Sequence, residues 1–133
     1  SLKIEYVQQV GWGTVVNDLT TRRIDMACAY FWQNSTRGRL VATTRPIIYD
    51  QLWVYAREGD TRLITEYAQL NDPQYTFAAI DGGAEAKVMD VRFPKAKRYS
   101  LPELAMSADF FEAVATGKAD FLVVDANSAA RYM

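Results

Sequence analysis

Histidine is absent from the sequence, and cysteine occurs once, as Cys28. A single cysteine forms no internal disulfide, and without histidine a Ser-His-Asp triad, a histidine-ligated zinc and an imidazole acid or base are excluded. Cys28 lies in the apolar run "IDMACA", which is more typical of a buried, unreactive thiol than of a nucleophile. The sequence therefore lacks the residues that most of the usual hydrolase mechanisms need.

Long apolar runs and a strong charge imbalance are also missing. No stretch approaches the roughly 18 apolar residues that a membrane-spanning helix requires. Half of the 133 residues are apolar and the net formal charge is only -1, which indicates a folded domain and disfavours a general nucleic-acid binder. A chain of this length buries one ordinary core, or parts of two. The sequence has no signal peptide, but it opens on Ser-Leu-Lys, which we expect not to be the native start. The lack of a signal peptide therefore does not exclude an exported protein.

Strand-like and helix-like patterns alternate along the chain. Period-2 alternation and short apolar runs predict strands at residues 2–7, 24–29, 39–43, 51–57, 75–80 and 119–125. Apolar residues at helical spacing predict helices at residues 12–19, 62–70, 84–91 and 107–116, and a short last helix. We expect Ser107 and Asn127 to cap the last two helices and Gly117 to adopt the left-handed conformation. Such alternation predicts an α/β fold with mainly parallel sheets and helices on both faces.

Ligands of such sheets bind beyond the carboxyl ends of the strands, which directs attention to residues 30–37, 81–85 and 125–127. "DGGAE", residues 81–85, follows a predicted strand and opens a helix, so its free N–H groups suit an anion, although Gly-Gly is also common in plain tight turns. Asp125 ends another predicted strand. Its carboxylate is suited to hold an ammonium group or to cap the following helix.

Arg37 follows the predicted strand at 24–29 by a short loop, and its planar guanidinium is well matched to a carboxylate. A solvated arginine is the alternative. If the three loops converge, Arg37 and the glycine turn hold a carboxylate, Asp125 holds an ammonium, and Tyr30 or Trp32 covers a side chain. This combination describes a free amino acid. For at least one of Tyr30, Phe31 and Trp32 we expect packing against the core instead.

Longer motifs run through the chain in a recognisable order. The first is "RRIDMACAYFWQNSTRGRLVATTRPIIYD", and "LNDPQYTFAAIDGGAEA", "FPKAKRYS", "FFEAVATGKADFLVVD" and "NSAARYM" follow it. In their order and spacing, these motifs resemble those of the type 2 periplasmic solute-binding proteins. Asp25, Arg37 and Pro46 are separated as the corresponding residues are in that family. The resemblance is to the amino-acid-binding branch, bacterial extracellular solute-binding family 3, and covers essentially the whole chain. "AVATGKADFLVVD" is its most specific piece.

The resemblance implies a type 2 periplasmic-binding-protein fold, in which two lobes joined by a hinge close over a small polar solute, most often a free amino acid. Arg37 would grip the ligand carboxylate, Asp125 its amino group, and backbone groups near other loop residues would complete the contacts. The ligand-binding residues implied in this way are Tyr30, Trp32, Arg37, Gly83, Ala84 and Asp125. The family is periplasmic or extracellular and delivers its ligand to the membrane permease of an ABC importer, or signals through a fused receptor, without cofactor, metal or catalytic residues.

The sequence also departs from the family pattern. Tyr30 and Trp32 replace a small residue and a threonine, and Ile47 replaces a tyrosine. The family's first strand and its last hinge strand and helices have no counterpart, which predicts an internal fragment. Residues 1–49 would form a partial lobe one, and residues 50–133 a hinge strand with most of lobe two. An incomplete lobe leaves strand edges open, which predicts an edge-paired or swapped homodimer.

Two other functions remain open at this point. The resemblance extends to cyclohexadienyl or arogenate dehydratases, which have the same fold and use carboxylates or hydroxyls rather than histidine. In this sequence Glu85, beside the glycine turn, is the one candidate acid. A buried Glu85 with a raised pKa would favour such an enzyme, and a solvent-facing Glu85 simple binding. A regulatory effector domain of a transcription factor is disfavoured by Arg37 and the glycine turn. We expect binding without chemistry.

Overall fold

A four-stranded sheet dominates the second part of the chain in the computed structural model, which describes residues 3–63 and 66–132. The strands are β1 (Leu52–Ala56), β2 (Thr76–Ile80), β3 (Lys97–Leu101) and β4 (Phe121–Asp125). Their order across the sheet is β1-β4-β2-β3; β2 is parallel to both neighbours, and β1 is antiparallel to β4. The predicted strands at 51–57, 75–80 and 119–125 are confirmed, and the sheet is mainly parallel, as predicted, with β1 as its antiparallel strand.

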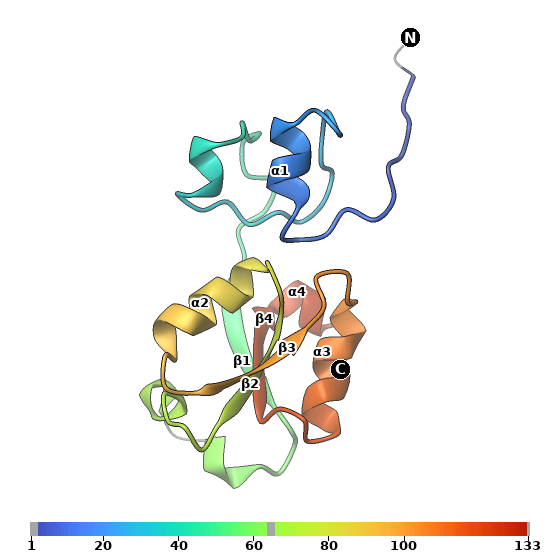
Figure 1. Cartoon of the computed structure of the whole chain (residues 1–133). Helices are drawn as coiled ribbons and strands as arrows, with labels where there is room; N and C mark the ends of the chain where they lie inside the picture. The colour runs from blue at the N-terminus through green and yellow to red at the C-terminus, as the bar shows by residue number, and fades with distance from the viewer. Residues whose placement is uncertain (1–2, 64–65, 133) are drawn as a thin grey trace.

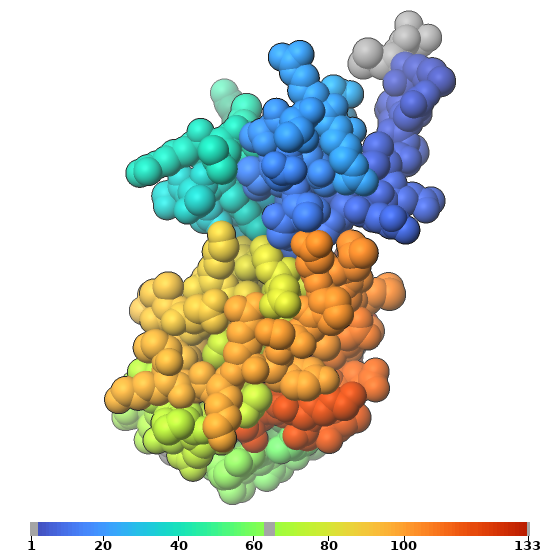
Figure 2. Space-filling model, viewed as in Figure 1, coloured from blue at the N-terminus to red at the C-terminus, as the bar shows by residue number. Residues whose placement is uncertain are grey.

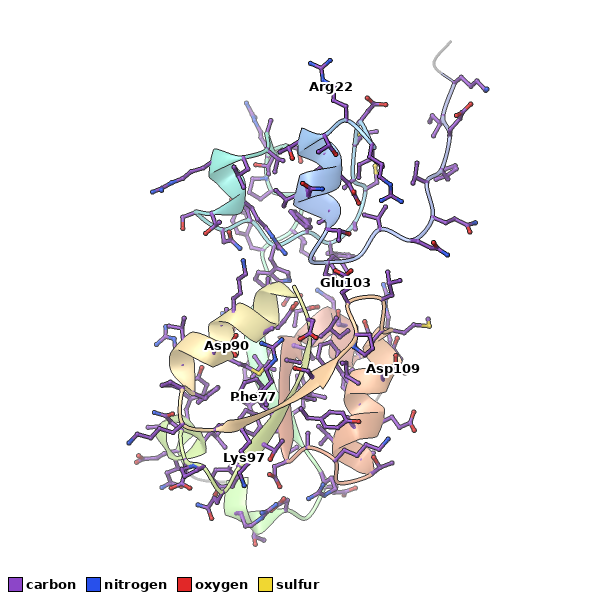
Figure 3. All side chains as sticks on the ribbon, in the orientation of Figure 1. Arg22, Phe77, Asp90, Lys97, Glu103 and Asp109 are labelled. Carbon is purple, nitrogen blue, oxygen red and sulfur yellow. The ribbon has the colours of Figure 1, made fainter. Side chains whose placement is uncertain are left out.

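Helices cover both faces of this sheet (Figure 1). On one face lies α2 (Ala84–Arg92), and on the other lie α3 (Ser107–Ala115) and α4 (Ala126–Ala129). β2 and β4 are central, so four consecutive side chains of each are buried, and each strand contributes to the apolar clusters on both faces. Phe77 of β2 lies inside the α2 face with Phe93 and Phe121 (Figure 3). The α/β prediction, with helices on both faces, is confirmed.

The first part of the chain, residues 3–50, is built differently. It contains α1 (Val15–Thr20) and the 3-10 turn η1 (Arg37–Arg39), and no strand. The helix predicted at 12–19 is confirmed, although it begins only at Val15. The strands predicted at 24–29 and 39–43 are wrong, and so is the strand at 2–7 over its described residues, 3–7. Among residues 3–63 and 66–132, no strand lies beside these segments to form hydrogen bonds with them, and an alternating pattern alone does not make a strand.

The missing strands change the burial expected for this part. Ile4 and Met26 are 68% and 70% exposed, and Cys28 is exposed rather than buried. In Figure 1 the first part lies beyond the end of the sheet that carries the start of α2, and a single connection leads from it into β1.

Several helix ends also differ from expectation. The helix predicted at 62–70 is replaced by the 3-10 turns η2 (Thr61–Leu63) and η3 (Tyr67–Leu70), with residues 64–65 outside the described residues. Ser107 is the first residue of α3 rather than its cap, and the Asp109 carboxylate accepts the Met106 N–H instead. Gly117 has φ +77°, as expected. No helix within residues 3–63 and 66–132 is long and apolar enough to cross a membrane.

Candidate ligand-binding site

Arg37 lies at the junction of the two parts and is only 5% exposed. Its Nη1 donates to the carbonyl of Trp32 at 3.0 Å, within its own loop, and its Nη2 donates to the carbonyl of Gly82 at 3.2 Å, across the junction. The guanidinium carbon lies 4.1 Å from the centre of the Phe31 ring. Burial lowers the pKa of Arg37, and nearby Glu85 opposes that shift. Arg37 is thus held as a buried cation between the two parts, not as a solvated one.

The loop before Arg37 is shaped to hold this arginine. The Asn34 side-chain carbonyl accepts the Arg37 N–H at 2.9 Å, and Gly38 N–H bonds to the Asn34 carbonyl, which starts η1. Phe31 stacks on the guanidinium, so it is the aromatic residue of the run that packs structurally. Trp32 is half-buried, whereas Tyr30 is 64% exposed.

A cavity of about 400 Å³ lies between this loop and the start of the sheet part. It is within the size range of small-molecule sites. Its wall combines the loop Trp32 to Thr36 with Leu52 of β1 and one side of α2, namely Ala84, Glu85, Lys87, Val88, Val91 and Arg92. Figure 2 shows the residues of the first part meeting those of the sheet part along a seam. Both parts therefore contribute residues to one open cavity.

The glycine turn brings the two backbones together. Gly82 has φ +78°, and a Cβ added to it would overlap the Cα and N of Gly13 in the first part. Only glycine fits both the conformation and the contact. Gly83 follows as the N-cap of α2, which begins at Ala84 as predicted, and the Gly83 N–H bonds to the Ile80 carbonyl at 3.1 Å.

A second contact between the parts lies beside the first. Glu103, which follows β3, points toward the first part (Figure 3). A Cβ added to Gly11 would lie 2.7 Å from its Cδ, and one added to Gly13 would lie 2.7 Å from its Oε2. Gly11 and Gly13 thus leave room for the Glu103 side chain, while Gly13 and Gly82 let the two backbones approach closely.

Glu85 lies in the first turn of α2, in the cavity wall, and is half-buried. Its carboxylate lies near Gly83, since a Cβ on Gly83 would be 3.2 Å from Oε2. Burial raises the pKa of Glu85 and the neighbouring Asp125 raises it further, while its own N–H and Arg37 lower it. The pKa of Glu85 is therefore affected in opposite directions by the cation of Arg37 and by the carboxylate of Asp125.

Asp125 ends β4 and caps α4. Its Oδ1 accepts the Ser128 N–H at 2.8 Å, and its Oδ2 accepts the Ser128 hydroxyl at 2.8 Å. The capping alternative is thus observed, and Asn127, expected as the cap, instead donates to Asp50 at 2.5 Å. Asp125 remains close enough to Glu85 to influence its charge.

The structure therefore brings most of the predicted site residues to one junction. Trp32 and Ala84 line the cavity, whereas Arg37, Gly83 and Asp125 do not. Arg37 and Gly83 are the chain neighbours of the wall residues Thr36 and Ala84, and Asp125 lies close enough to the wall residue Glu85 to influence its pKa. Tyr30 does not line the cavity. Sequence reasoning missed Asn34, Ser35 and Thr36 as wall residues. The polar run "QNST" between Trp32 and Arg37 was the available signal. Within the described residues no group of three or more Cys, Asp or Glu is placed to hold a metal ion.

Comparisons with known proteins agree with this architecture. The family model of the bacterial extracellular solute-binding proteins, family 3, matches residues 1–122. No curated protein matches the chain. An ancestral amino acid-binding protein, a precursor of cyclohexadienyl dehydratase, has a similar structure, with a TM-score of 0.80 and 24% identity; the match covers 98% of this chain and 56% of that one.

Two natural proteins give similar matches. An amino acid ABC transporter substrate-binding protein from Streptococcus pneumoniae, bound to L-arginine, has a TM-score of 0.78 at 20% identity, over 92% of this chain and 49% of its own. The cysteine-binding protein from Campylobacter jejuni has a TM-score of 0.74 at 22% identity, over 87% and 44%. The chain thus spans about half the length of the proteins it resembles.

Proposed function

This chain belongs to the bacterial extracellular solute-binding proteins, family 3, and from that premise we propose that it binds a free amino acid in the cavity between its two parts. The observation that carries the proposal is Arg37, a buried residue whose guanidinium bonds across the junction and which directly follows Thr36 in the wall of a cavity of about 400 Å³. A buried cation at a small cavity favours an anionic group in its ligand, and a carboxylate fits the guanidinium fork.

The roles of the individual residues follow from their positions. Arg37 and the backbone near Gly83 and Ala84 at the start of α2 hold the ligand carboxylate, with the Ala84 N–H as the donor because the Gly83 N–H already bonds to the Ile80 carbonyl. Asp125 holds the amino group, because its two oxygens keep spare lone pairs while they cap α4. Trp32 covers the ligand side chain from the first part. Tyr30 contributes backbone groups at most, since its ring points away from the cavity wall into solvent.

Residues 1–49 act as part of lobe one in this proposal, and residues 50–133 as a hinge strand with most of lobe two. Ligand binding closes the junction and excludes water from it. In this proposal the whole protein is located in the periplasm or outside the cell. Its partner is the permease of an ABC importer or a fused receptor. Support for these partners comes from the family and from the transporter proteins of similar fold.

A dehydratase is the second candidate, because Glu85 meets the condition set for it. Glu85 is half-buried in the cavity wall with a raised pKa, and one structure of similar fold is a precursor of cyclohexadienyl dehydratase. Incubation with a cyclohexadienyl amino acid, followed by the ultraviolet absorbance of an aromatic product, tests this activity. Product formation that Glu85→Gln abolishes would replace the binding proposal.

A thermal-shift screen against the twenty common amino acids tests the binding proposal. At about a hundred times the dissociation constant, a ligand adds about 2.7 kcal/mol to the free energy of unfolding, or several degrees in Tm. We expect a shift with a few amino acids in the wild type and none in Arg37→Ala. An equal shift in Arg37→Ala, or none in the wild type, contradicts the proposal.

A further inference from the structure

Arg98 of β3 forms ion pairs with two carboxylates that lie on different parts of the fold. Its Nη2 donates to Asp81 Oδ1 at 2.6 Å, and its Nη1 donates to Asp90 Oδ2 at 3.1 Å. Asp81 directly follows β2 and opens the glycine turn, whereas Asp90 lies in α2 (Figure 3). The Arg98 guanidinium therefore joins the glycine turn to the helix that follows it.

The position of this guanidinium depends on the two carboxylates. Arg98 Nε is buried and has no hydrogen-bond partner among residues 3–63 and 66–132. A buried donor without a partner costs free energy, so the bonds of Nη1 and Nη2 are what favours this position of the side chain. A guanidinium that bonds to one carboxylate on each of these nitrogens also has little freedom to rotate.

Asp81 is held by its backbone as well as by its side chain. Its N–H bonds to the Leu101 carbonyl at 2.9 Å, at the end of β3. Both bonds of Asp81 thus run to β3 and fix the residue immediately before Gly82. The Gly82 carbonyl in turn accepts Arg37 Nη2 at 3.2 Å, across the junction. Arg98 is therefore linked to the junction through Asp81 and the glycine turn.

We propose that Arg98 is a positioning residue for the amino-acid site, and that its ion pair with Asp81 fixes the glycine turn to which Arg37 bonds. The inference rests on the proposed function, in which Arg37 holds the ligand carboxylate. A shift of the Gly82 carbonyl by about 0.5 Å away from Arg37 would already stretch their bond beyond hydrogen-bonding distance. The role is indirect, since neither Arg98 nor Asp81 lines the cavity.

Asp90 provides a matched control within the same cluster. Asp81→Ala and Asp90→Ala each remove one carboxylate from Arg98, and the two carboxylate side chains are similarly exposed, at 55% and 49%. Only Asp81 adjoins the glycine turn. Exposed ion pairs contribute little to stability, so both variants should lower Tm by a few degrees at most. A purely structural role of Arg98 would therefore affect the two variants alike, whereas a positioning role would separate them in affinity.

The first test measures the affinity of each variant for the twenty common amino acids by calorimetry. For those that the wild type binds, we expect Asp81→Ala and Arg98→Met to weaken binding about fivefold or more, and Asp90→Ala to stay within about twofold of the wild type. Arg98→Lys should retain part of the affinity, since its ammonium can still pair with Asp81. The double variant of Asp81→Ala and Arg98→Met should bind no more weakly than the weaker single variant, because both changes remove the same ion pair. Equal affinities of Asp81→Ala and Asp90→Ala, or additive losses in the double variant, overturn the inference.

A second measurement separates this inference from the proposed function, because it needs no ligand. NMR hydrogen exchange of the Gly83 amide, which bonds to the Ile80 carbonyl at 3.1 Å, reports the order of the glycine turn. The Gly117 amide, bonded to the Val114 carbonyl at the same distance in another turn, is the internal reference.

We expect Asp81→Ala and Arg98→Met to speed exchange at Gly83 several-fold relative to Gly117, and Asp90→Ala to leave it unchanged. If Gly83 exchanges at the wild-type rate in Asp81→Ala and Arg98→Met, the inference is wrong whatever the protein binds. If exchange changes as expected but the wild type binds none of the twenty amino acids, Arg98 positions the turn as inferred and the proposed function fails.

Discussion

At the scale of single residues, the contact between Gly82 and Gly13 controls how closely the two parts approach. Gly82 and Gly59 both have positive φ, +78° and +79°, but only Gly82 has a neighbouring backbone where a Cβ would be. We predict that alanine at either position costs about 1 kcal/mol of stability through backbone strain. Gly82→Ala alone should also weaken amino-acid binding, by about tenfold or more, because the junction cannot close.

Thermal unfolding and calorimetric affinity of the two alanine variants check this prediction. Gly59→Ala is the matched control, since a Cβ there has nothing within 4 Å. If Gly82→Ala and Gly59→Ala bind amino acids equally well, close approach of the glycine turn to the first part is not needed for binding.

Single residues also show the limits of reading the site from the sequence. The sequence predicted a shared site for Arg37 and the glycine turn only if their loops converge, and the structure brings them into contact through the Arg37 Nη2 bond to the Gly82 carbonyl. The strand expected before Arg37, at residues 24–29, does not form. Two further facts depend on tertiary contacts that no local pattern contains: the burial of Arg37, whose guanidinium packs on Phe31 and bonds to Gly82, and the exposure of Tyr30.

At the scale of secondary-structure elements, burial explains which predictions were right. β2 and β4 are short apolar runs buried on both faces, so composition alone identified them. β3, "KRYSL", is a charged edge strand that was missed, because it exists through its pairing with β2 from Thr76↔Lys97 to Ile80↔Leu101. Residues 24–29 are the converse case: they are apolar enough for a buried strand, yet no strand lies beside them.

α4 allows the two roles of Asp125 to be separated. Its carboxylate caps this four-residue helix and, in the proposed function, holds the ligand amino group. We predict that Asp125→Ala loses about 1 kcal/mol of stability with the cap, whereas Asp125→Asn loses little, because asparagine caps helices as well as aspartate does. Both variants should bind amino acids more weakly, since neither retains the negative charge.

Denaturant unfolding and binding of the best amino acid, measured on both variants, check this prediction. Normal affinity in Asp125→Asn would show that Asp125 serves only as a cap. A large loss of stability in Asp125→Asn would show instead that the charge itself is needed at α4.

At the scale of the whole molecule, the two edges of the sheet differ in their capacity to pair with another chain. β3 carries Lys97 and Arg98 at its edge, and such charges discourage pairing. β1, at the other edge, carries Trp53 at 55% exposure and follows Ile47 and Tyr49, which are 95% and 87% exposed. We therefore propose that the predicted homodimer forms through β1 and its preceding segment.

Light scattering over a range of concentrations measures the mass of this 15.0 kDa chain and tests the dimer. We predict twice that mass at high concentration for the wild type and the monomer mass for Trp53→Lys, because a lysine on an edge strand opposes pairing. Leu104→Lys is the control, since Leu104 is similarly exposed, at 58%, but lies beyond β3. Trp53→Lys also leaves the cavity wall intact, because Trp53 does not line it, so monomer and dimer can be compared for amino-acid affinity. A wild type that stays monomeric at every concentration would show that the exposed edge of β1 is not a pairing surface. Equal amino-acid affinity of the wild-type dimer and the Trp53→Lys monomer would show that each copy binds its ligand independently.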